Sequence, residues 1–515
     1  MSNEKEYIVV VNRGVDLTEF DQEMSSEYGD SSAIPNRAIE VANARLGSKR
    51  MTHWMLSDDE AEQLLNDERV LSVEIPPDQR NDIQIGIKAT QTSDFTKPSA
   101  LDSDKVNWGL RRCIEATNIY SDGTTASNEY PYALDGTGVD VVIQDSGLQV
   151  DHPEFVGRVQ QIDWYTESGL PGSQNVNHYR DFDGHGTHCA GIAAGKTYGW
   201  AKNAHVYAQK LAGLEAPSDP NSGIPISDAF DAIRLWHAAK TNGRPTIVNM
   251  SWGYSASVGG SPTGGNYRGT GWTWGVDYTA NLALWQATGI VIPTNGASRT
   301  IPVRVPSVDA EIEDMIDAGI HVVIAAGNDY YKGDVVGGVD YDNTIVYGGS
   351  TYFYHRGSSP HSDEAIIVGN SDSVAQQSGA NFLDKTSNSS SRGPRLTCYA
   401  PGTNIISTCS TTSIYATGDY TPDTNYKIAL INGTSMAAPQ VAGVIALYLT
   451  VQPTLTPKNA KDKILNESKP TLFSTGSDSD YSEFGTSLLG APNKFLYSKY
   501  GRQPYYISGG VTLTK

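Results

Sequence analysis

The feature that most constrains the fold is a run of small and apolar residues at positions 432–448, with the sequence NGTSMAAPQVAGVIALY. A helix over residues 441–448 would be apolar on every face, and such a helix has to lie inside a protein core. Ser435 stands shortly before it, among small side chains. The pattern therefore predicts that Ser435 lies in the first turn of a buried helix.

The position of Ser435 suits a nucleophile. The first turn of a helix carries unsatisfied backbone N–H groups and a partial positive charge, and both stabilise an oxyanion formed by attack on a carbonyl. The alternative is that Thr434 and Ser435 only cap the helix, as Ser and Thr commonly do at such a boundary. A base, an orienting carboxylate and a further oxyanion donor elsewhere in the chain would decide between the two.

Composition limits the classes of partner. Lys and Arg number 38 against 58 Asp and Glu, which gives a net charge of −20. Such a field repels nucleic acid and anionic lipid, so neither is expected as a partner. Residues 8–11 are too short for the core of a signal peptide, and no later apolar run is long enough to cross a bilayer. We therefore expect no membrane association and a cytoplasmic or particle-associated location.

The four cysteines, Cys113, Cys189, Cys398 and Cys409, are irregularly spaced and match neither a disulfide framework nor a zinc ribbon. Reduced thiols are expected without secretion, although a bridge between Cys398 and Cys409 is left open.

The N-terminal residues 1–78 have the pattern of a small split βαβ module. Ser57 to Glu60 is a capping box that predicts the start of a helix. Residues 79–104 are polar without apolar periodicity, which predicts an exposed connector. The elements expected in the module are strands at 6–11, 51–56 and 70–75 and helices at 37–46 and 61–65.

From residue 105 onward, apolar strands alternate with amphipathic helices, which predicts a parallel sheet with right-handed crossovers. Asp145 and Asn328 each follow a buried strand, where open α/β sheets place their sites. Each taken alone is more simply a turn residue. The expected strands are 139–143, 207–211, 246–253 and 320–326, and the expected helices follow Ser227, as a cap, and Ser307.

His185 and His188 lie three residues apart and would share one helical face. A zinc pair is therefore the first alternative to a general base. Zinc would need a third ligand close by, and no Glu, Cys or His stands at a familiar downstream spacing. We predict no metal at these residues.

Four motifs occur in one order: Asp-Ser-Gly at Asp145, His-Gly-Thr-His at His185, Ala-Ala-Gly-Asn at Asn328 and Gly-Thr-Ser-Met-Ala at Ser435. Together they resemble the motifs of the subtilisin-like serine proteases, the subtilases, in that family's order Asp, His, Ser. Residues 185–211 are most similar to the proteinase-K-like branch. The resemblance covers residues 106–492 and, more loosely, 7–77. It implies an α/β fold with a subtilisin-like parallel sheet and helices on both faces, preceded by a small α+β ferredoxin-like domain.

The resemblance also implies roles for single residues. Ser435 would be the nucleophile, His185 the base, Asp145 the orienting carboxylate and Asn328 the oxyanion donor. His188 would serve helix packing, and Cys189 would lie beneath the base as a small buried residue. The substrate, an extended polypeptide, would pair with and pack against Ser251, Trp252, Gly253, Ala325, Ala326 and Gly327. Trp252 replaces the leucine common in the family, which leaves the pocket preference open.

By the same resemblance, residues 1–78 correspond to an inhibitory propeptide, with the processing site in the connector 79–104. A permanent interaction module is the alternative. The peptidase domain would span 105–473, and the tail 474–515 would wrap this domain or dock a partner. No cofactor is needed for the chemistry. A structural calcium ion is left open without assigned ligands, because the calcium loop of subtilisins is missing and Thr397 replaces an aspartate that holds calcium in proteinase K.

Two expansions, residues 254–306 and 330–363, are longer than in most relatives, and the first has a helix pattern at 276–287. The expected function is that of a serine endopeptidase made as an autoprocessed precursor. Two other classes remain as alternatives. One is a non-enzymatic peptide-binding or structural role on a retained protease fold. The other is an α/β-hydrolase esterase, which is disfavoured because Ala437 stands where its Gly-x-Ser-x-Gly motif needs glycine.

Overall fold

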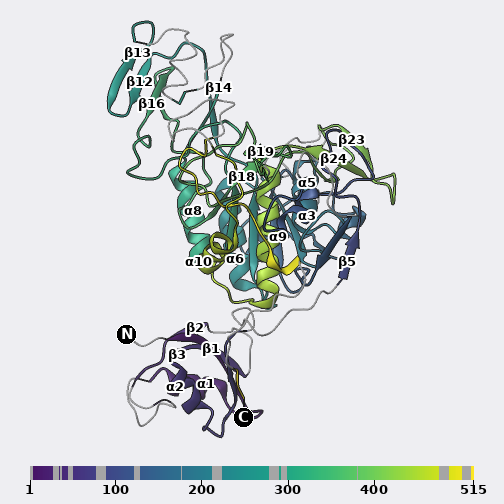
Figure 1. The fold of residues 1–515 in the computed structure, drawn as a ribbon, viewed down its shortest axis with the longest axis vertical. Helices are drawn as coiled ribbons and strands as arrows, with labels where there is room; N and C mark the ends of the chain where they lie inside the picture. Colours follow the sequence, from purple (N-terminus) through teal and green to yellow (C-terminus); the bar gives the residue numbers. More distant parts are fainter. Residues whose placement is uncertain are drawn as a thin grey trace.

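The computed structural model describes residues 4–26, 34, 37–43, 50–76, 89–120, 128–175, 177–211, 223–277, 289–290, 299–379, 381–474, 487–501 and 512–514. At its centre lies a sheet with the strand order β21-β18-β15-β10-β7-β9-β8, in which every paired neighbour is parallel (Figure 1). The α/β fold class is confirmed. The strands are β7 (Asp140–Asp145), β8 (Val159–Gln160), β9 (His205–Lys210), β10 (Thr246–Met250), β15 (His321–Ala325), β18 (Ile366–Ser371) and β21 (Cys398–Pro401).

Helices cover both faces of this sheet, and each face has its own apolar cluster. The larger cluster contains α3 (Trp108–Cys113), α5 (His185–Ala194), α9 (Thr434–Val451) and α10 (Pro457–Glu467). The other contains α4 (Trp164–Ser168), α6 (Ile226–Ala239) and α8 (Pro306–Asp317). Among the described residues only α9 is long and apolar enough to cross a membrane, but 89% of it is buried in the protein. It is the buried helix that the sequence predicts.

The predicted cap at Ser227 is wrong. Helix α6 begins at Ile226, with Pro225 in the N-cap position and no side-chain cap. The fixed φ of proline already suits the start of a helix, so α6 begins two residues earlier than a helix capped by Ser227 would.

The N-terminal module has the order β1 (Lys5–Val11), α1 (Leu17–Met24), β2 (Val41–Asn43), β3 (Met51–Leu56), α2 (Asp58–Leu64) and β4 (Val70–Glu74). The predicted capping box of Ser57 and Glu60 is present. The helix predicted at 37–46 is wrong: the described part of that range contains β2, which pairs with β3. The helix is instead α1, which Asp16 caps and which buries Phe20 and Met24 one turn apart. Strand β25 (Thr512–Thr514) pairs with the outer edge of β4.

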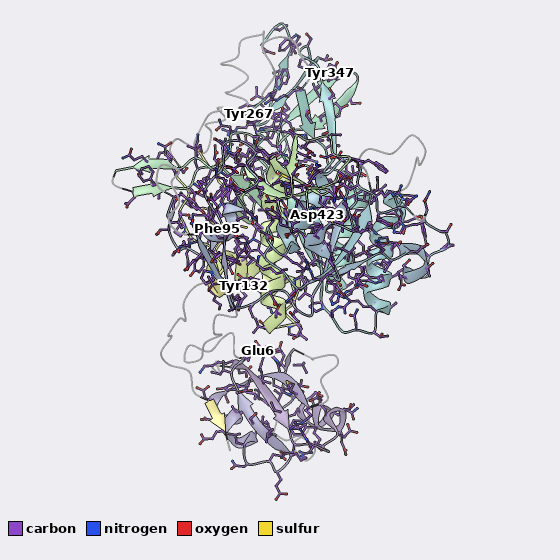
Figure 2. The ribbon with its side chains drawn as sticks, turned by 90° about the vertical axis from the view of Figure 1, so that its right-hand side faces the viewer. Glu6, Phe95, Tyr132, Tyr267, Tyr347 and Asp423 are labelled. Carbon is purple, nitrogen blue, oxygen red and sulfur yellow. The ribbon has the colours of Figure 1, made fainter. Side chains whose placement is uncertain are left out.

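Residues 89–104 are not the exposed connector that their polarity predicts. Strand β5 (Ala89–Thr92) pairs with β6 (Glu129–Tyr132), and Phe95 is fully buried in the main cluster of the catalytic body. The carbonyl of Phe95 accepts a hydrogen bond from Tyr120 Oη at 2.9 Å. In Figure 2, Phe95 and Tyr132 lie in the catalytic body, whereas Glu6 lies in the separate N-terminal module. One large apolar side chain thus outweighs the polar residues around it.

The two expansions fold together as one accessory subdomain. Its main sheet has the order β13-β12-β16-β17, so a strand of the first expansion pairs with one of the second (Figures 1 and 2, near Tyr267 and Tyr347). The helix predicted at 276–287 falls almost entirely outside the described residues. The strands of the subdomain are β11 (Ser255–Val258), β12 (Gly264–Tyr267), β13 (Thr270–Thr273), β14 (Arg299–Pro302), β16 (Thr344–Tyr347) and β17 (Ser350–Phe353).

The C-terminal part of the chain closes the catalytic body. In the described tail, Phe495 and Leu496 are fully buried, and the backbone of Phe495 forms an isolated parallel β-bridge with Tyr399. The tail therefore wraps the catalytic domain along residues 487–501. The remaining elements are η1 (Pro153–Phe155), β19 (Gln376–Ser378), β20 (Asn381–Leu383), β22 (Ile405–Cys409), β23 (Thr417–Asp419), β24 (Lys427–Ile431) and η2 (Lys499–Gly501).

Candidate active site

The four motif residues meet at the carboxyl edge of the parallel sheet. Asp145 is the last residue of β7, and Asn328 follows the end of β15. His185 is the first residue of α5, and Ser435 is the second residue of α9. The site is thus assembled from two strand ends and two helix starts, which are rigid parts of the fold.

Asp145 and His185 form the central contact. The Asp145 Oδ1 atom lies 2.8 Å from His185 Nδ1, and their side chains are 4% and 17% exposed. Burial disfavours the charged imidazolium, but Asp145 and, after it, Cys189 together outweigh this, so the pKa of His185 is raised well above its usual value. Because Asp145 occupies Nδ1, the second ring nitrogen, Nε2, is the one left for an incoming proton.

Ser435 does not cap its helix. The N-cap of α9 is Gly433, and no side chain provides a cap hydrogen bond, so the capping alternative is wrong. The Ser435 hydroxyl donates to the carbonyl of Ser251 at 3.2 Å. The Ser435 carbonyl in turn accepts from Ser251 Oγ at 3.0 Å and from the Cys189 thiol at 3.3 Å. The backbone of Ser435 is therefore fixed. The Cys189 thiol that donates to it also lies 3.9 Å from His185 Nδ1, so Ser435 and the base share one neighbour.

Asn328 is oriented by Thr434. The Asn328 Oδ1 atom accepts from the Thr434 N–H at 2.9 Å and from Thr434 Oγ1 at 3.1 Å. The amide nitrogen, Nδ2, therefore points away from Thr434. It lies close to the Gly433 backbone, since a Cβ added at Gly433 would be 3.3 Å from it. Gly433 has a φ of 151°, which only glycine adopts without strain. The Ser435 N–H has no acceptor among the described residues, as expected in the first turn of a helix.

Asp181 links the loop after β7 to the start of α5. Its Oδ1 atom accepts from Ser146 Oγ at 2.9 Å and from the Gly184 N–H at 2.8 Å. Its Oδ2 atom accepts from the Thr187 N–H at 2.9 Å and from Thr187 Oγ1 at 2.6 Å. Ser146 Oγ also accepts from the Gly186 N–H at 2.9 Å. The buried Asp181 carboxylate thus fixes the two segments that carry the acid and the base relative to each other.

The start of α5 also packs directly against the loop after β7. A Cβ at Gly186 would lie 2.1 Å from the carbonyl oxygen of Gly147. Only glycine allows this approach, which sets the distance between the two segments.

The residues around the base include the second histidine and a thiol. His188 Nε2 contacts the carbonyl oxygens of Ile405 and Ala429, and burial lowers the pKa of His188 to about 3. It packs α5 in the predicted way. In the described part of the chain, one group could supply three metal-ligand atoms within 4.8 Å of one another, namely Asp145, His185 and Cys189. These are the atoms of the acid–base pair and the thiol beneath it.

The predicted substrate residues lie around Ser435. Gly253 is exposed and Trp252 is half-buried. The Trp252 indole donates to Gln144 Oε1 at 3.3 Å. Ala325 and Ala326 are only 6% and 3% exposed, so they offer little surface to a bound side chain. The half-buried Gly327 donates its N–H to Thr434 Oγ1 at 3.2 Å and so joins this wall to the start of α9.

Several site residues were not singled out by sequence reasoning. Asp181 and Tyr415 were not considered, and Thr434 was considered only as a cap. Tyr415 stacks obliquely on His185, with 6.4 Å between ring centroids. Asp181 stands four residues before His185, and this acidic residue at a helix start is the one local signal that could have indicated it.

Comparisons with known proteins indicate the family of the chain. The family model described as Subtilase family matches residues 136–486. The subtilisin-like serine protease Cur l 4.0101 of Cochliobolus lunatus is 31% identical over 368 residues, which are 70% of this chain and 54% of that protein. The subtilisin-like serine protease Pen c 2 of Penicillium citrinum is 28% identical over 412 residues, 78% of this chain and 68% of that protein. The chain thus spans between about half and two thirds of these relatives.

Among solved structures, a cold-adapted subtilisin-like serine proteinase matches 76% of this chain and 98% of its own, with 21% identity and a TM-score of 0.47. The family match covers well over half of the chain and includes Asp145, His185, Asn328 and Ser435. This chain belongs to the subtilase family.

Proposed function

We propose that the protein is a serine endopeptidase that hydrolyses peptide bonds in extended polypeptides. The observation that carries the proposal is the 2.8 Å contact between Asp145 and His185 beside Ser435, whose backbone is fixed at a helix start. An unfolded or extended segment is the expected substrate, because binding along residues 251–253 uses the substrate's own backbone.

The proposed reaction uses the groups of this chain alone. As Ser435 Oγ attacks the scissile carbonyl carbon, His185 Nε2 takes the hydroxyl proton, and the C=O electron pair moves to the oxygen. Asn328 Nδ2 and the Ser435 N–H donate to this oxyanion. The C–N bond then breaks, and the imidazolium gives its proton to the leaving nitrogen. Water repeats the sequence on the acyl ester and releases the acid and free Ser435. We propose no cofactor, and we assign no calcium ligand.

We also propose that the chain is made as a precursor with the N-terminal module as its propeptide. Helix α9 has 18 residues and so spans about 27 Å. Ser435 lies at its amino end, whereas the module lies beyond its carboxyl end, where Ile8 and Glu74 line a small pocket with Val451 and Thr454. Inhibition by the module therefore requires a second docking position, over the cleft.

The test is the intact mass of the full-length chain made alongside Ser435→Ala. Wild type is expected to be cut upstream of Ala89, because residues 89–105 are part of the catalytic body, and the variant is expected to stay whole. Wild type should also take up a fluorophosphonate, and the variant should not. Turnover of a peptide should fall about 10⁶-fold in the variant, a magnitude carried over from subtilisin itself.

Other outcomes separate the parts of the proposal. Labelling without cleavage would retain the peptidase and reject the precursor. Neither labelling nor cleavage in the wild type would reject the peptidase and leave a peptide-binding or structural role.

A further inference from the structure

The segment next to Ser435 continues without interruption into a strand of the accessory subdomain. Residues 251–254 lead directly into β11. Strand β11 pairs with β14 and with no other strand of the described chain. Within the described residues one edge of β11 is therefore unpaired, and it extends the segment along which a substrate would bind.

The direction of the backbone groups shows which residues face this free edge. The Tyr254 carbonyl accepts from the Val303 N–H at 3.0 Å, and the Tyr254 N–H donates to Ser359 at 2.9 Å, so both groups of Tyr254 face the β14 side. Backbone groups of successive residues in a strand point to opposite edges. Those of Ser255 and Ser257 consequently point to the free edge, as do those of Gly253.

The register with β14 agrees with this assignment. Ser255 lies opposite Pro302, which has no N–H to give to a ladder. Ser358 and Ser359 approach Gly253, since a Cβ there would meet Ser358 Oγ at 2.8 Å and the Ser359 carbonyl at 3.3 Å. They lie on the β14 side, because Ser359 also bonds Tyr254.

The free edge is suited to a backbone partner. Gly253, Ser255 and Ser257 are all exposed, whereas Val258 is buried in the core of the subdomain. Their side chains are small and uncharged, and no proline or lysine interrupts β11. Exposed edge strands that must avoid pairing with other chains commonly carry proline or charged residues, especially lysine. This edge has none of them.

We infer that β11 is an additional substrate-binding strand, which pairs with the part of an extended polypeptide that lies upstream of the scissile bond. The inference rests on the proposed peptidase function. The Ser251 carbonyl is 3.2 Å from Ser435 Oγ, so the residue that supplies the scissile carbonyl lies beside Ser251. In an antiparallel pairing, roughly the third, fifth and seventh upstream residues lie beside Gly253, Ser255 and Ser257. The recognition is of backbone, and it tolerates many side chains.

The experiment measures kcat/KM for fluorogenic peptides with one cleavage site and four to eight residues upstream of it. Lengthening is expected to raise kcat/KM about tenfold, because each added backbone hydrogen bond contributes modestly. Ser257→Pro removes the N–H that faces the free edge and leaves the ladder with β14 intact. It is expected to lose part of the gain with the long peptide while cutting the short one like wild type. Ser257→Ala keeps the N–H and is expected to keep the gain.

A second measurement acts on the substrate and is independent of how the variant folds. N-methylation at about the seventh upstream residue should remove part of the gain in wild type. The inference is overturned if kcat/KM does not depend on upstream length, if Ser257→Pro retains the gain, or if only downstream extension matters. Failure of wild type to cut any of these peptides would instead reject the proposed function.

Discussion

The catalytic centre and the accessory subdomain are built in different ways. At the centre, the groups around Ser435 come from the strand ends and helix starts of the main body, and the Asp181 carboxylate alone accepts from Ser146, Gly184 and Thr187. In the part of the subdomain that the structure describes, β11 has a strand partner on one edge only. The groups of the catalytic centre are held in one geometry by these hydrogen bonds. The subdomain instead leaves a strand edge available to a bound polypeptide.

The subdomain also contains a buried carboxylate that accepts several hydrogen bonds, namely Asp340. Asp340 is fully buried and accepts from Arg268 Nε at 2.7 Å, Lys332 Nζ at 2.7 Å and Asn343 Nδ2 at 3.0 Å. Arg268 belongs to the first expansion and the other residues to the second. This carboxylate therefore holds the two insertions together without touching the reacting groups. Variants in the catalytic centre should lower turnover of every peptide. Variants in the subdomain should change only the gain in kcat/KM that longer peptides show.

Among variants that keep Ser435 and leave the contact between Asp145 and His185 intact, the largest effect is expected for Asn328→Ala. Loss of its amide donor should lower kcat by about 10²–10³ with KM little changed, a magnitude known from the corresponding change in subtilisin. The matched control is Asn266→Ala in β12 of the subdomain, which should leave turnover of a short peptide unchanged. If Asn266→Ala lowered kcat as much as Asn328→Ala, the subdomain would contribute to turnover as much as the catalytic centre does. Steady-state kinetics on purified, folded enzyme make the measurement.

A smaller loss is expected for Asp181→Asn. The amide NH2 would replace one of the two carboxylate oxygens and so face the donor of either Gly184 or Thr187. A shift of the base by about 1 Å can cost up to ~10²-fold in rate. We expect kcat to fall roughly 10- to 100-fold. Ser146→Ala breaks the same link without changing charge and should follow in the same direction.

Asp183→Asn is the charge control for this prediction, because it removes a carboxylate close to His185 that does not join the two segments. If this variant loses as much activity as Asp181→Asn, the effect is electrostatic and the positioning role is wrong. The rate of fluorophosphonate labelling provides an independent readout.

The sequence predicted the centre better than the subdomain for a physical reason. Each motif residue stands at the end of one local element, and the order of strands and helices determines where those ends meet. The short motifs around Asp145 and His185 resemble those of the subtilases, and this resemblance predicted that the two residues act together. Asp181 could not be predicted in this way, because its partners come from separate segments and its own neighbourhood is an ordinary polar turn.

Long-range pairing and short segments account for the other differences. Strands β12 and β16 pair across the intervening α8 and β15, so the union of the two expansions has no local signal. In the N-terminal module, β2 has only three residues and α1 shows one buried pair, Phe20 and Met24. Such short patterns do not distinguish a helix from a strand. Phe95 shows the same limit, since one buried ring anchors a mostly polar segment on the core.

The pH dependence tests the centre alone. His185 must be neutral to accept the proton, and its pKa is raised by the Asp145 carboxylate. The acid limb of kcat/KM is therefore expected above pH 6.5, with a tenfold fall per pH unit below it. Asp145→Asn removes the charge, so it should move the limb to lower pH while lowering the maximum. An acid limb below pH 6 in wild type would contradict the raised pKa, and Asp340→Asn should leave the limb in place.

The smallest effect on turnover is expected for Asp340→Asn. The buried amide cannot compensate Lys332 and Arg268, so the subdomain should lose about 1–3 kcal/mol of local stability. Hydrogen exchange should quicken in β12 and β16 but not in β7 or β15, and a four-residue substrate should be cut as in wild type. Long substrates should lose part of their advantage, because a loosened subdomain holds β11 less firmly. If short and long substrates instead lost activity together, the subdomain would support the catalytic centre itself, and the separation between the two regions would fail.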